Sequence, residues 1–406
     1  MRRFPTIIKG NRMKNSVKNS LSDGAKVRLL FVIPSFAIGG ITSSLRSLLL
    51  ALDYSKLDVE IFCREKVGPL KNAFPQARTL PENIWLSSLI KDGNLFQKAL
   101  FYLFKCIRVG LRIIGVDMNI VYGRIGGRQL KTYQYDAVIS FHEGLSPIVC
   151  YYPAKKRIAW IHSDYRRYFD MVKKDEGKQY QLYDQIVCVS EFARSVFLDT
   201  YPFLAEKTIA IHNIIPIEEI KLKSKASTGI DERFTTSVFT IVSVGRLDPV
   251  KQFDRIPSIA AEVKLLTNIP FRWYIIGGER GFGDVDSFIL NDINEYNVER
   301  EVILLGEKEN VYPYIRQADL YVCTSVSESF PLAVNEAKAL GVPIVSNAFP
   351  SVRESITEGL DGYIVSLQNM AIVITEVMKG NRVFPGSTID NNTPLLQFYK
   401  LVNIDL

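Results

Sequence analysis

The stretch VRLLFVIPSFAIGGITSSLRSLLLALDYSKLDVEIFC, residues 27–63, contains the pattern that decides the fold. It begins with an apolar run, Val27 to Pro34, which predicts a buried parallel strand. A loop with two glycines follows, and then Thr42 to Leu52 repeats its apolar residues at helical spacing behind Ser and Thr. Leu57 to Cys63 predicts a second strand. This strand–loop–helix–strand unit predicts an α/β fold with right-handed crossovers.

Similar short apolar runs recur along both halves of the chain and end in polar residues or glycine. In the first half they are Tyr135–Phe141, Arg157–Ile161 and Gln185–Val189, and in the second half Thr240–Val244, Phe271–Ile276, Val302–Leu305, Leu320–Cys323 and Val342–Val345. A Lys- and Ser-rich stretch, Lys221 to Thr228, lies between the two series and is the expected linker. The chain is therefore predicted to hold two doubly wound α/β domains, whose ligand sites lie at the strand ends.

Composition excludes several classes of protein. The chain has 406 residues, of which 47% are hydrophobic and 23% charged, so it can bury a sizeable core and is not disordered. Its five cysteines form no close pair, which argues against a disulfide framework, a zinc ribbon or an iron–sulfur site and fits a reducing cytoplasm. Three histidines leave little for a histidine-rich metal site.

The charge is unevenly distributed. Residues 1–220 carry 32 Lys and Arg against 20 Asp and Glu, whereas residues 221–406 carry 18 against 23. A basic first half favours an anionic partner such as phospholipid headgroups, and the alternative is a solvated surface without a partner. Aromatic residues are not interleaved with the cations, so no nucleic-acid partner is expected. Residues 1–28 lack the apolar run of a secretory signal and are expected to form a basic flexible tail.

Residues 96–115, FQKALFYLFKCIRVGLRIIG, predict a basic amphipathic helix. Their cations fall on one helical stripe and apolar side chains lie opposite; the members are Lys98, Lys105, Arg108 and Arg112 against Leu103, Phe104, Ile107, Leu111 and Ile114. Such a helix is suited to a membrane interface. The alternative is a surface helix whose apolar face packs on the domain core. No stretch is long and apolar enough for a predicted membrane-spanning helix.

Two segments of the second half carry the chemistry that a nucleotide diphosphate requires. In Gly245-Arg246-Leu247-Asp248-Pro249-Val250-Lys251, a glycine lets the chain turn close to a ligand, Arg246 offers a planar fork of donors and Lys251 a mobile positive charge. The alternative is a loop with solvated cations. Gly306, after another predicted strand, begins a weaker candidate segment where a base could stack.

The other segment, SESFPLAVNEAKALGVP, spans residues 327–343. Pro331 predicts a helix start whose first N–H groups face an anion. Glu328 precedes that helix and Glu336 lies inside it, so the two carboxylates can bracket sugar and ribose hydroxyls. The alternative is a helix-capping role for Glu328 and a surface charge at Glu336.

Arg246 with Lys251, followed by Glu-x7-Glu at Glu328 and Glu336, resembles the retaining glycosyltransferase family 4, of GT-B fold. The resemblance covers roughly residues 26–380. It extends to Gly277-Gly278, to Ser351 through Glu354, and in the first half to Gly39-Gly40, to Trp160 through Asp164 and to Cys188 through Glu191. Two departures are Ser329 and Pro331, where the family often has glycines around the phenylalanine, and the glycine turn, which reads GGERGFG.

The resemblance implies a role for each matching residue. Arg246 and Lys251 would neutralise the diphosphate leaving group, Glu328 would hold donor-sugar hydroxyls, Glu336 would hold the ribose diol, and His162 would position the reacting groups. Further donor contacts would come from Gly39, Gly40, Gly245, Gly306, Ser329, Phe330, Pro331 and Leu332. Of the other histidines, His142 is expected either to line the cleft or to be structural, and His212 to be structural.

The resemblance further implies two tandem Rossmann-like domains facing a cleft, with a C-terminal helix that crosses back to the first domain. The expected boundaries are 1–25 for the tail, 26–218 for an acceptor domain, 219–390 for a donor domain and 391–406 for the crossing helix.

The implied activity is retaining transfer of a sugar from a nucleotide-diphosphate sugar to a lipid-linked or surface-polysaccharide acceptor. It would take place at the cytoplasmic face of the membrane, by an enzyme peripherally bound to anionic lipid. No metal and no cofactor are expected, because Arg and Lys do the neutralising. The alternatives are a catalytically silent scaffold subunit and a sugar-nucleotide epimerase of the same fold.

Overall fold

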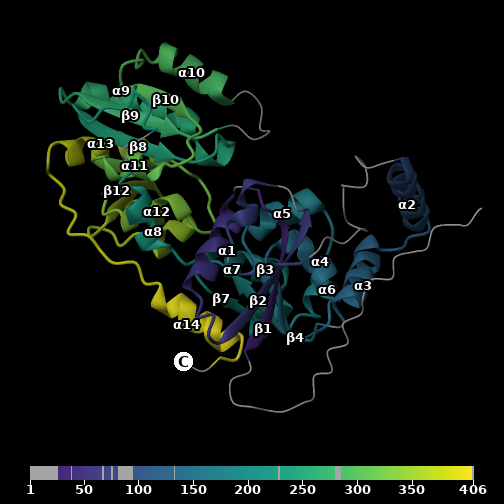
Figure 1. Cartoon of the computed structure of the whole chain (residues 1–406). Helices are drawn as coiled ribbons and strands as arrows, with labels where there is room; N and C mark the ends of the chain where they lie inside the picture. Colours follow the sequence, from purple (N-terminus) through teal and green to yellow (C-terminus); the bar gives the residue numbers. More distant parts are fainter. Residues whose placement is uncertain are drawn as a thin grey trace, which may run out of the picture.

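A computed structural model describes residues 26–404 except 38, 66–67, 75, 81–94, 132, 227–228 and 279–284. The expected basic tail and the end of the expected linker therefore lie outside the described residues. The described chain forms two α/β units, each built on its own parallel sheet (Figure 1). The predicted fold class is confirmed.

The first sheet has seven parallel strands in the order β3-β2-β1-β4-β5-β6-β7. They are β1 (Val27–Ser35), β2 (Leu57–Glu65), β3 (Arg78–Thr79), β4 (Tyr135–Ser140), β5 (Ala154–Ile161), β6 (Gln185–Cys188) and β7 (Thr208–Ala210). The strand order reverses between β1 and β4, which are direct neighbours with Leu29 opposite Ala137. In sheets of this kind the crevice at such a reversal is where ligands bind.

The second sheet has six parallel strands in the order β10-β9-β8-β11-β12-β13. They are β8 (Phe239–Val244), β9 (Phe271–Ile276), β10 (Val302–Gly306), β11 (Leu320–Cys323), β12 (Ile344–Asn347) and β13 (Gly362–Val365). Here the order reverses between β8 and β11. The Gly245–Lys251 segment follows β8 and the Glu328 segment follows β11, so both lie at the reversal.

Helices cover both faces of each sheet, and the buried strand residues form the cores between them. The helices of the first unit are α1 (Gly40–Ala51), α2 (Leu95–Ile113), α3 (Met118–Leu130), α4 (Ser146–Val149), α5 (Tyr165–Val172), α6 (Gly177–Tyr180) and α7 (Glu191–Thr200). Those that follow are α8 (Ile217–Lys223), α9 (Ile256–Leu266), α10 (Val285–Glu295), α11 (Tyr312–Arg316), α12 (Leu332–Ala339), α13 (Leu367–Met378) and α14 (Asn392–Leu401).

The C-terminal helix α14 packs on the first unit, although the second sheet precedes it in the chain (Figure 1). Phe398 is fully buried in the first core and stacks on Phe31 of β1. The Tyr399 hydroxyl accepts a hydrogen bond from the Asp53 backbone N–H, and Lys156 donates to the Leu401 carbonyl. The predicted crossing helix is therefore present.

The expected linker is partly wrong, because its first residues belong to a helix. Helix α8 ends at Lys223 and packs against α12 of the second unit. Glu218 and Glu219 lie in its first turn and Lys221 and Lys223 in its last, which is the favourable arrangement for the helix dipole. Lys223 also pairs with Glu219 at 2.6 Å, one turn earlier.

The basic amphipathic helix is present as α2, which projects away from the two sheets (Figure 1). Among its described apolar side chains, Leu103 is 55% exposed, Ile107 45% and Ile113 79%, so these do not pack on the core as the alternative required, whereas Leu111 is partly buried. Within the described part of the chain, no helix is long and apolar enough to cross a membrane.

Candidate active site

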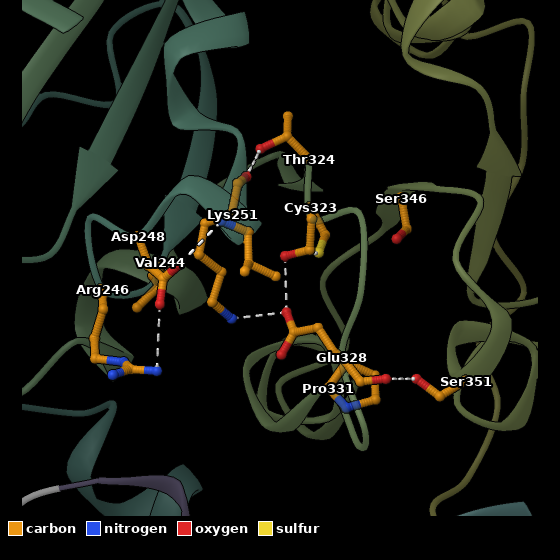
Figure 2. Close-up of polar contacts among 12 residues, drawn as sticks. Val244, Arg246, Asp248, Lys251, Cys323, Thr324, Glu328, Pro331, Ser346 and Ser351 are labelled. Carbon is orange, nitrogen blue, oxygen red and sulfur yellow. Dashed lines mark hydrogen bonds and ion pairs between the residues drawn. The ribbon is translucent and has the colours of Figure 1, made fainter. Parts of the chain in front are cut away.

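Lys251 and Glu328, which are 77 residues apart in the sequence, form an ion pair where β8 and β11 end (Figure 2). Lys251 Nζ lies 2.7 Å from Oε1 of Glu328, and both side chains are largely buried. The two loops are also joined by the Thr324 hydroxyl, which donates to the Lys251 carbonyl, and by the Val326 N–H, which donates to the carbonyl of Val250. The fold therefore brings together Lys251, which is predicted to bind the diphosphate, and Glu328, which is predicted to bind the sugar.

The electrostatics of this pair keep Lys251 charged. Burial alone would lower the pKa of the ammonium, but the charge of Glu328 and its hydrogen bond raise it above the ordinary value. Lys251 and the Ser325 hydroxyl both donate to Oε1 of Glu328. Within the described residues Oε2 accepts no hydrogen bond, so this oxygen is available to a ligand hydroxyl.

Arg246 lies beside the pair but is more open. Its guanidinium is 56% exposed and sits 3.7 Å from Asp248, whose carboxylate caps the turn that carries Lys251 (Figure 2). Gly245 is closely surrounded, since a Cβ there would lie 3.3 Å from Cζ of Phe253 and 3.4 Å from Cε of Lys251.

Helix α12 starts immediately after the Glu328 loop, as its proline predicts. Pro331 is the N-cap and Leu332 the first helical residue, and no side chain caps this end. Its first backbone N–H groups therefore remain available to an anion. Ser329 and Phe330 form the approach to this helix start.

Glu336 lies one turn inside α12, where the hydroxyl of Tyr312 donates to its Oε1 at 3.2 Å. Burial raises the pKa of Glu336 to about 7, against the opposing effect of that hydrogen bond. The carboxyl is therefore held by Tyr312 and poised to change charge near neutral pH. No sequence pattern indicated Tyr312.

The first unit contributes a glycine directly opposite α12. A Cβ placed on Gly40 would lie 3.7 Å from the Cδ1 of Leu332, so the start of α1 faces the start of α12 across the two units. Gly39, the N-cap of α1, would meet nothing within 4 Å. The structure therefore brings Gly40 to the helix start that is expected to bind phosphate.

His162 follows β5 and belongs to the same meeting point of the two units. Two residues further on, Asp164 accepts a long hydrogen bond of 3.5 Å from the Ser327 hydroxyl of the second unit. Burial lowers the pKa of His162 to about 4, so the ring is neutral at pH 7. Its buried Nε2 has no hydrogen-bond partner among the described residues.

Glu143, which the sequence analysis did not select, lies behind this histidine. It is 2% exposed, and it accepts hydrogen bonds from the Ser163 hydroxyl and, at 3.4 Å, from the His162 backbone N–H. Burial opposes its ionisation, yet its pKa lies below the ordinary value because His142, His162 and Ser163 stabilise the carboxylate. The signal available in the sequence was an acidic residue immediately after a strand-end histidine.

The other two histidines have different surroundings. His142 accepts the Gly144 backbone N–H at its Nδ1 and so caps the turn after β4. His212 was expected to be structural; its Nε2 lies 2.9 Å from Glu354 of the second unit. His212 therefore contributes to the contact between the units.

Two glycines of the second unit are required for different structural reasons. A Cβ on Gly277 would lie 1.7 Å from the carbonyl oxygen of Gly245, so packing between neighbouring loops alone requires glycine there. Gly306 has φ of +75°, in the left-handed region that glycine adopts without strain.

The described residues contain no group of three or more His, Cys, Asp or Glu side chains that could hold a metal ion. We expected no Asp-x-Asp string in the sequence, and this is wrong, because Asp284-Val285-Asp286 is one. Its first residue lies outside the described residues, and the rest begins α10. Metal independence stays a prediction.

Two family matches cover both sheets. Residues 38–219 match the family described as Glycosyltransferase Family 4, and residues 230–379 match Glycosyl transferases group 1. The chain therefore belongs to the glycosyltransferases of family 4, as its motifs predicted. Structural similarity agrees on a GT-B fold.

Among solved structures, the lipopolysaccharide outer core galactosyltransferase WaaB in its apo form matches with a TM-score of 0.66 and 16% identity, covering 93% of this chain and 99% of that one. Anabaena HepE in complex with UDP matches with a TM-score of 0.60 and 14% identity, covering 93% and 100%. At these identities the similarity shows the fold.

Curated relatives match over a shorter stretch. The D-inositol 3-phosphate glycosyltransferase of Mycobacterium sp. (strain KMS) is 27% identical over 179 residues, which is 40% of this chain and 39% of the relative. The N-acetylgalactosamine-N,N'-diacetylbacillosaminyl-diphospho-undecaprenol 4-alpha-N-acetylgalactosaminyltransferase of Campylobacter jejuni is 29% identical over 165 residues, 40% of this chain and 41% of the relative. The match thus spans about two fifths of these relatives.

Proposed function

We propose that this protein is a retaining glycosyltransferase that moves a sugar from a nucleotide-diphosphate sugar to a lipid-linked or surface-polysaccharide acceptor. The observation that carries the proposal is the Lys251–Glu328 pair beside the uncapped start of α12, with Gly40 of the other unit opposite. It places a cation, free N–H groups and a carboxylate oxygen around one point. The complexes of HepE with UDP and with UDP-glucose support a nucleotide-sugar donor.

The charges in this site suggest how transfer proceeds. Loss of the nucleoside diphosphate leaves negative charge on phosphate oxygens, which Lys251, Arg246 and the first N–H groups of α12 stabilise where it develops. Oε2 of Glu328 accepts a sugar hydroxyl, and Glu336 accepts the ribose diol. No metal is needed for this neutralisation.

The proton of the acceptor hydroxyl requires a destination. With its pKa near 4, His162 is a weak base at neutral pH. A leaving phosphate oxygen on the same face of the sugar takes the proton instead, which accounts for retention of the anomeric configuration. His162 then positions the acceptor or the sugar.

The acceptor side of the proposal rests on α2. This helix carries four cations and no acid between Leu95 and Ile113, and its apolar residues Leu103, Ile107 and Ile113 are exposed. An exposed apolar stripe flanked by cations binds an anionic membrane interface. We propose that the enzyme works peripherally at the cytoplasmic membrane face, which is compatible with the undecaprenol-linked substrate named for the Campylobacter relative.

Nucleotide binding provides the first test. Thermal unfolding is measured with UDP, GDP, ADP and dTDP for the wild type and for Lys251→Ala, with Lys264→Ala as a control because that lysine sits on α9 and pairs with Glu301. One nucleotide should raise the Tm of the wild type and the control but not of Lys251→Ala. No shift with any nucleotide would remove the nucleotide-sugar proposal and favour the scaffold alternative.

Transfer is then tested with the sugar nucleotides of that base and a panel of polyprenyl-diphosphate saccharides. The proton spectrum of the product reports the anomeric configuration. Turnover of the donor to its epimer without an acceptor would favour the epimerase alternative.

Membrane binding is tested by sedimentation with vesicles of phosphatidylglycerol or of phosphatidylcholine. Leu103→Ser and Ile107→Ser should weaken binding to the anionic vesicles, whereas Leu265→Ser on α9, a side chain that is 87% exposed, should not. Equal binding by all three variants would contradict the role of α2.

A further inference from the structure

A carboxylate of the second unit caps a helix of the first. Glu354 lies at the end of the 3-10 turn Pro350–Glu354 that follows β12. Its Oε2 accepts the backbone N–H of Glu191 at 2.8 Å, and its Oε1 accepts that of Phe192 at 2.9 Å. These are the first two residues of α7, so the carboxylate satisfies two N–H groups that the helix itself leaves unpaired.

His212 completes this contact from another element of the first unit. Its Nε2 lies 2.9 Å from the same Oε2 of Glu354. Burial opposes ionisation of Glu354, but its pKa is lowered because His212 and the two N–H groups of α7 stabilise the carboxylate. All three contacts of this one side chain cross between the units, so they exist only while the units stay together.

The same turn is tied to the loop that carries Glu328. Three residues before Glu354, the Ser351 hydroxyl donates to the Glu328 carbonyl (Figure 2). From the first unit, the Ser190 hydroxyl donates to the Ser329 carbonyl at 2.6 Å while it also caps α7. Consecutive carbonyls of the loop are thus held from the two sides of the interface.

Phe330 extends the loop into the first unit. It packs against the first hydrophobic core, and its ring centroid lies 5.5 Å from that of His212. One aromatic side chain of the loop therefore touches the same histidine that contacts Glu354. The residues that join the two units are therefore also the residues that hold the loop at positions 328–330.

We infer that Glu354 is a positioning residue, which couples the approach of the two units to the shape of the donor-binding loop. The contacts that Ser329 and Phe330 make with the first unit are held only when the start of α7 sits on Glu354. This inference rests on the proposed function, since the loop is taken to bind the sugar nucleotide. It adds a residue that does not itself touch the substrate and that acts through Ser351, Glu328 and the start of α12.

The coupling follows from a conformational equilibrium. In the closed form the two units touch through Glu354, and in the open form they are apart. A ligand can shift such an equilibrium only by binding one form better than the other. Removing contacts made solely in the closed form raises the population of the open form. Because the loop loses its support from the first unit at the same time, the sugar nucleotide is bound and turned over less well.

The test uses three variants: Glu354→Gln, His212→Ala and the double variant that carries both changes. Each is compared with the control variant Glu358→Gln. Glu358 is a half-exposed carboxylate nearby, 4.0 Å from Arg353, and serves as the matched control for loss of charge. Circular dichroism checks that each variant is folded. Small-angle scattering without and with UDP reports the separation of the units, and donor kinetics report kcat and KM separately.

We expect Glu354→Gln to raise the radius of gyration of the unliganded protein, and to lower kcat/KM for the donor at least tenfold with a loss in kcat. His212→Ala should give a smaller loss. The double variant should lose less than the sum of the two single losses, because His212 and Glu354 share one contact, and any loss beyond that of Glu354→Gln reports the contact of His212 with Phe330. Glu358→Gln should match the wild type in both measurements.

Wild-type scattering together with wild-type kcat and KM in Glu354→Gln would overturn the inference. A lowered Tm with unchanged kinetics would assign the residue a purely structural role and overturn it as well. If the wild type itself neither binds a nucleotide nor transfers sugar, the proposed function fails instead, and scattering still decides whether Glu354 holds the units together.

Discussion

Lys251 and the Ser325 hydroxyl donate to the same oxygen of Glu328, so one carboxylate joins the two loops that meet at the reversal of the second sheet. The lysine is thereby held in place before any ligand arrives. A site of this kind has little to reorganise when phosphate charge develops, which is the condition for strong electrostatic stabilisation.

The first prediction separates the stabilising role of this pair from its chemical role. Lys251→Ala leaves Glu328 without its partner, which should cost about 1–3 kcal/mol of unfolding free energy and roughly 10²–10³-fold in transfer rate. Lys251→Met with Glu328→Gln should recover most of the stability, because no unpaired charge remains, and none of the rate. Urea unfolding and initial rates measure the two effects; recovery of activity in the double variant would contradict the assignment.

A second prediction uses two glycines with opposite packing. Gly40→Ala should fold as the wild type does, since its Cβ meets only the Leu332 side chain, at an ordinary contact of 3.7 Å. Its affinity for the nucleotide should nevertheless fall at least tenfold, because the methyl group occupies the approach to the start of α12. Gly277→Ala should lose stability, because its Cβ would lie 1.7 Å from the Gly245 carbonyl oxygen.

Thermal unfolding and UDP titration of the two variants distinguish these effects. A Gly40→Ala protein that binds UDP as tightly as the wild type would show that Gly40 does not approach the diphosphate.

The sequence patterns predicted ten of the thirteen described strands, because short apolar runs between glycine or polar ends are a local property. Strands β3, β7 and β13 and the order of the strands were not predicted. The patterns also selected the charged residues after β8 and β11 that the structure brings together, since the spacing of cations and carboxylates is visible along the chain. Helix α8 was not predicted, and its last residues were taken as linker, because this seven-residue helix depends on packing against α12.

Residues that act across the fold had no such signal. Tyr312 reaches Glu336 from a different helix, and Glu354 reaches α7 from the other unit. Neither partner is near in sequence, so no spacing rule connects them. The sequence likewise left open whether the apolar face of α2 packs on a core or is exposed, because periodicity alone does not decide this.

Glu336 provides a third prediction, on the pH dependence of stability. Its pKa is raised by burial to about 7, from an ordinary value of 4.5. Between these values the folded protein keeps a proton that the unfolded chain has released, so stability falls as the pH rises from about 4.5 to 7. The fall attributable to this group is at most about 3–4 kcal/mol.

Glu336→Gln should remove this part of the pH dependence, and the difference between the two proteins in urea unfolding at pH 5 and pH 7.5 isolates it from Glu176, whose pKa burial also raises to about 7. UDP affinity of the wild type should increase with pH over the same range, because the ribose diol needs an ionised acceptor. A pH-independent affinity would contradict the assignment of Glu336 to the ribose.

The last prediction concerns His162, whose pKa is lowered to about 4 because burial opposes its charge more strongly than the Glu143 carboxylate favours it. The unfolded chain takes up this proton near pH 6.5 and the folded protein only near pH 4, so this group reduces stability as the pH falls between those values. At pH 6 to 8 the ring stays neutral.

His162→Gln should therefore lower kcat without altering the shape of the pH–rate profile in that range. The ring resonances of His162, assigned by comparison with the variant, should not shift between pH 6 and 8. A limb near pH 6.5 that is present in the wild type and absent from His162→Gln would instead make this histidine a proton-transfer group, and the leaving phosphate would lose that role.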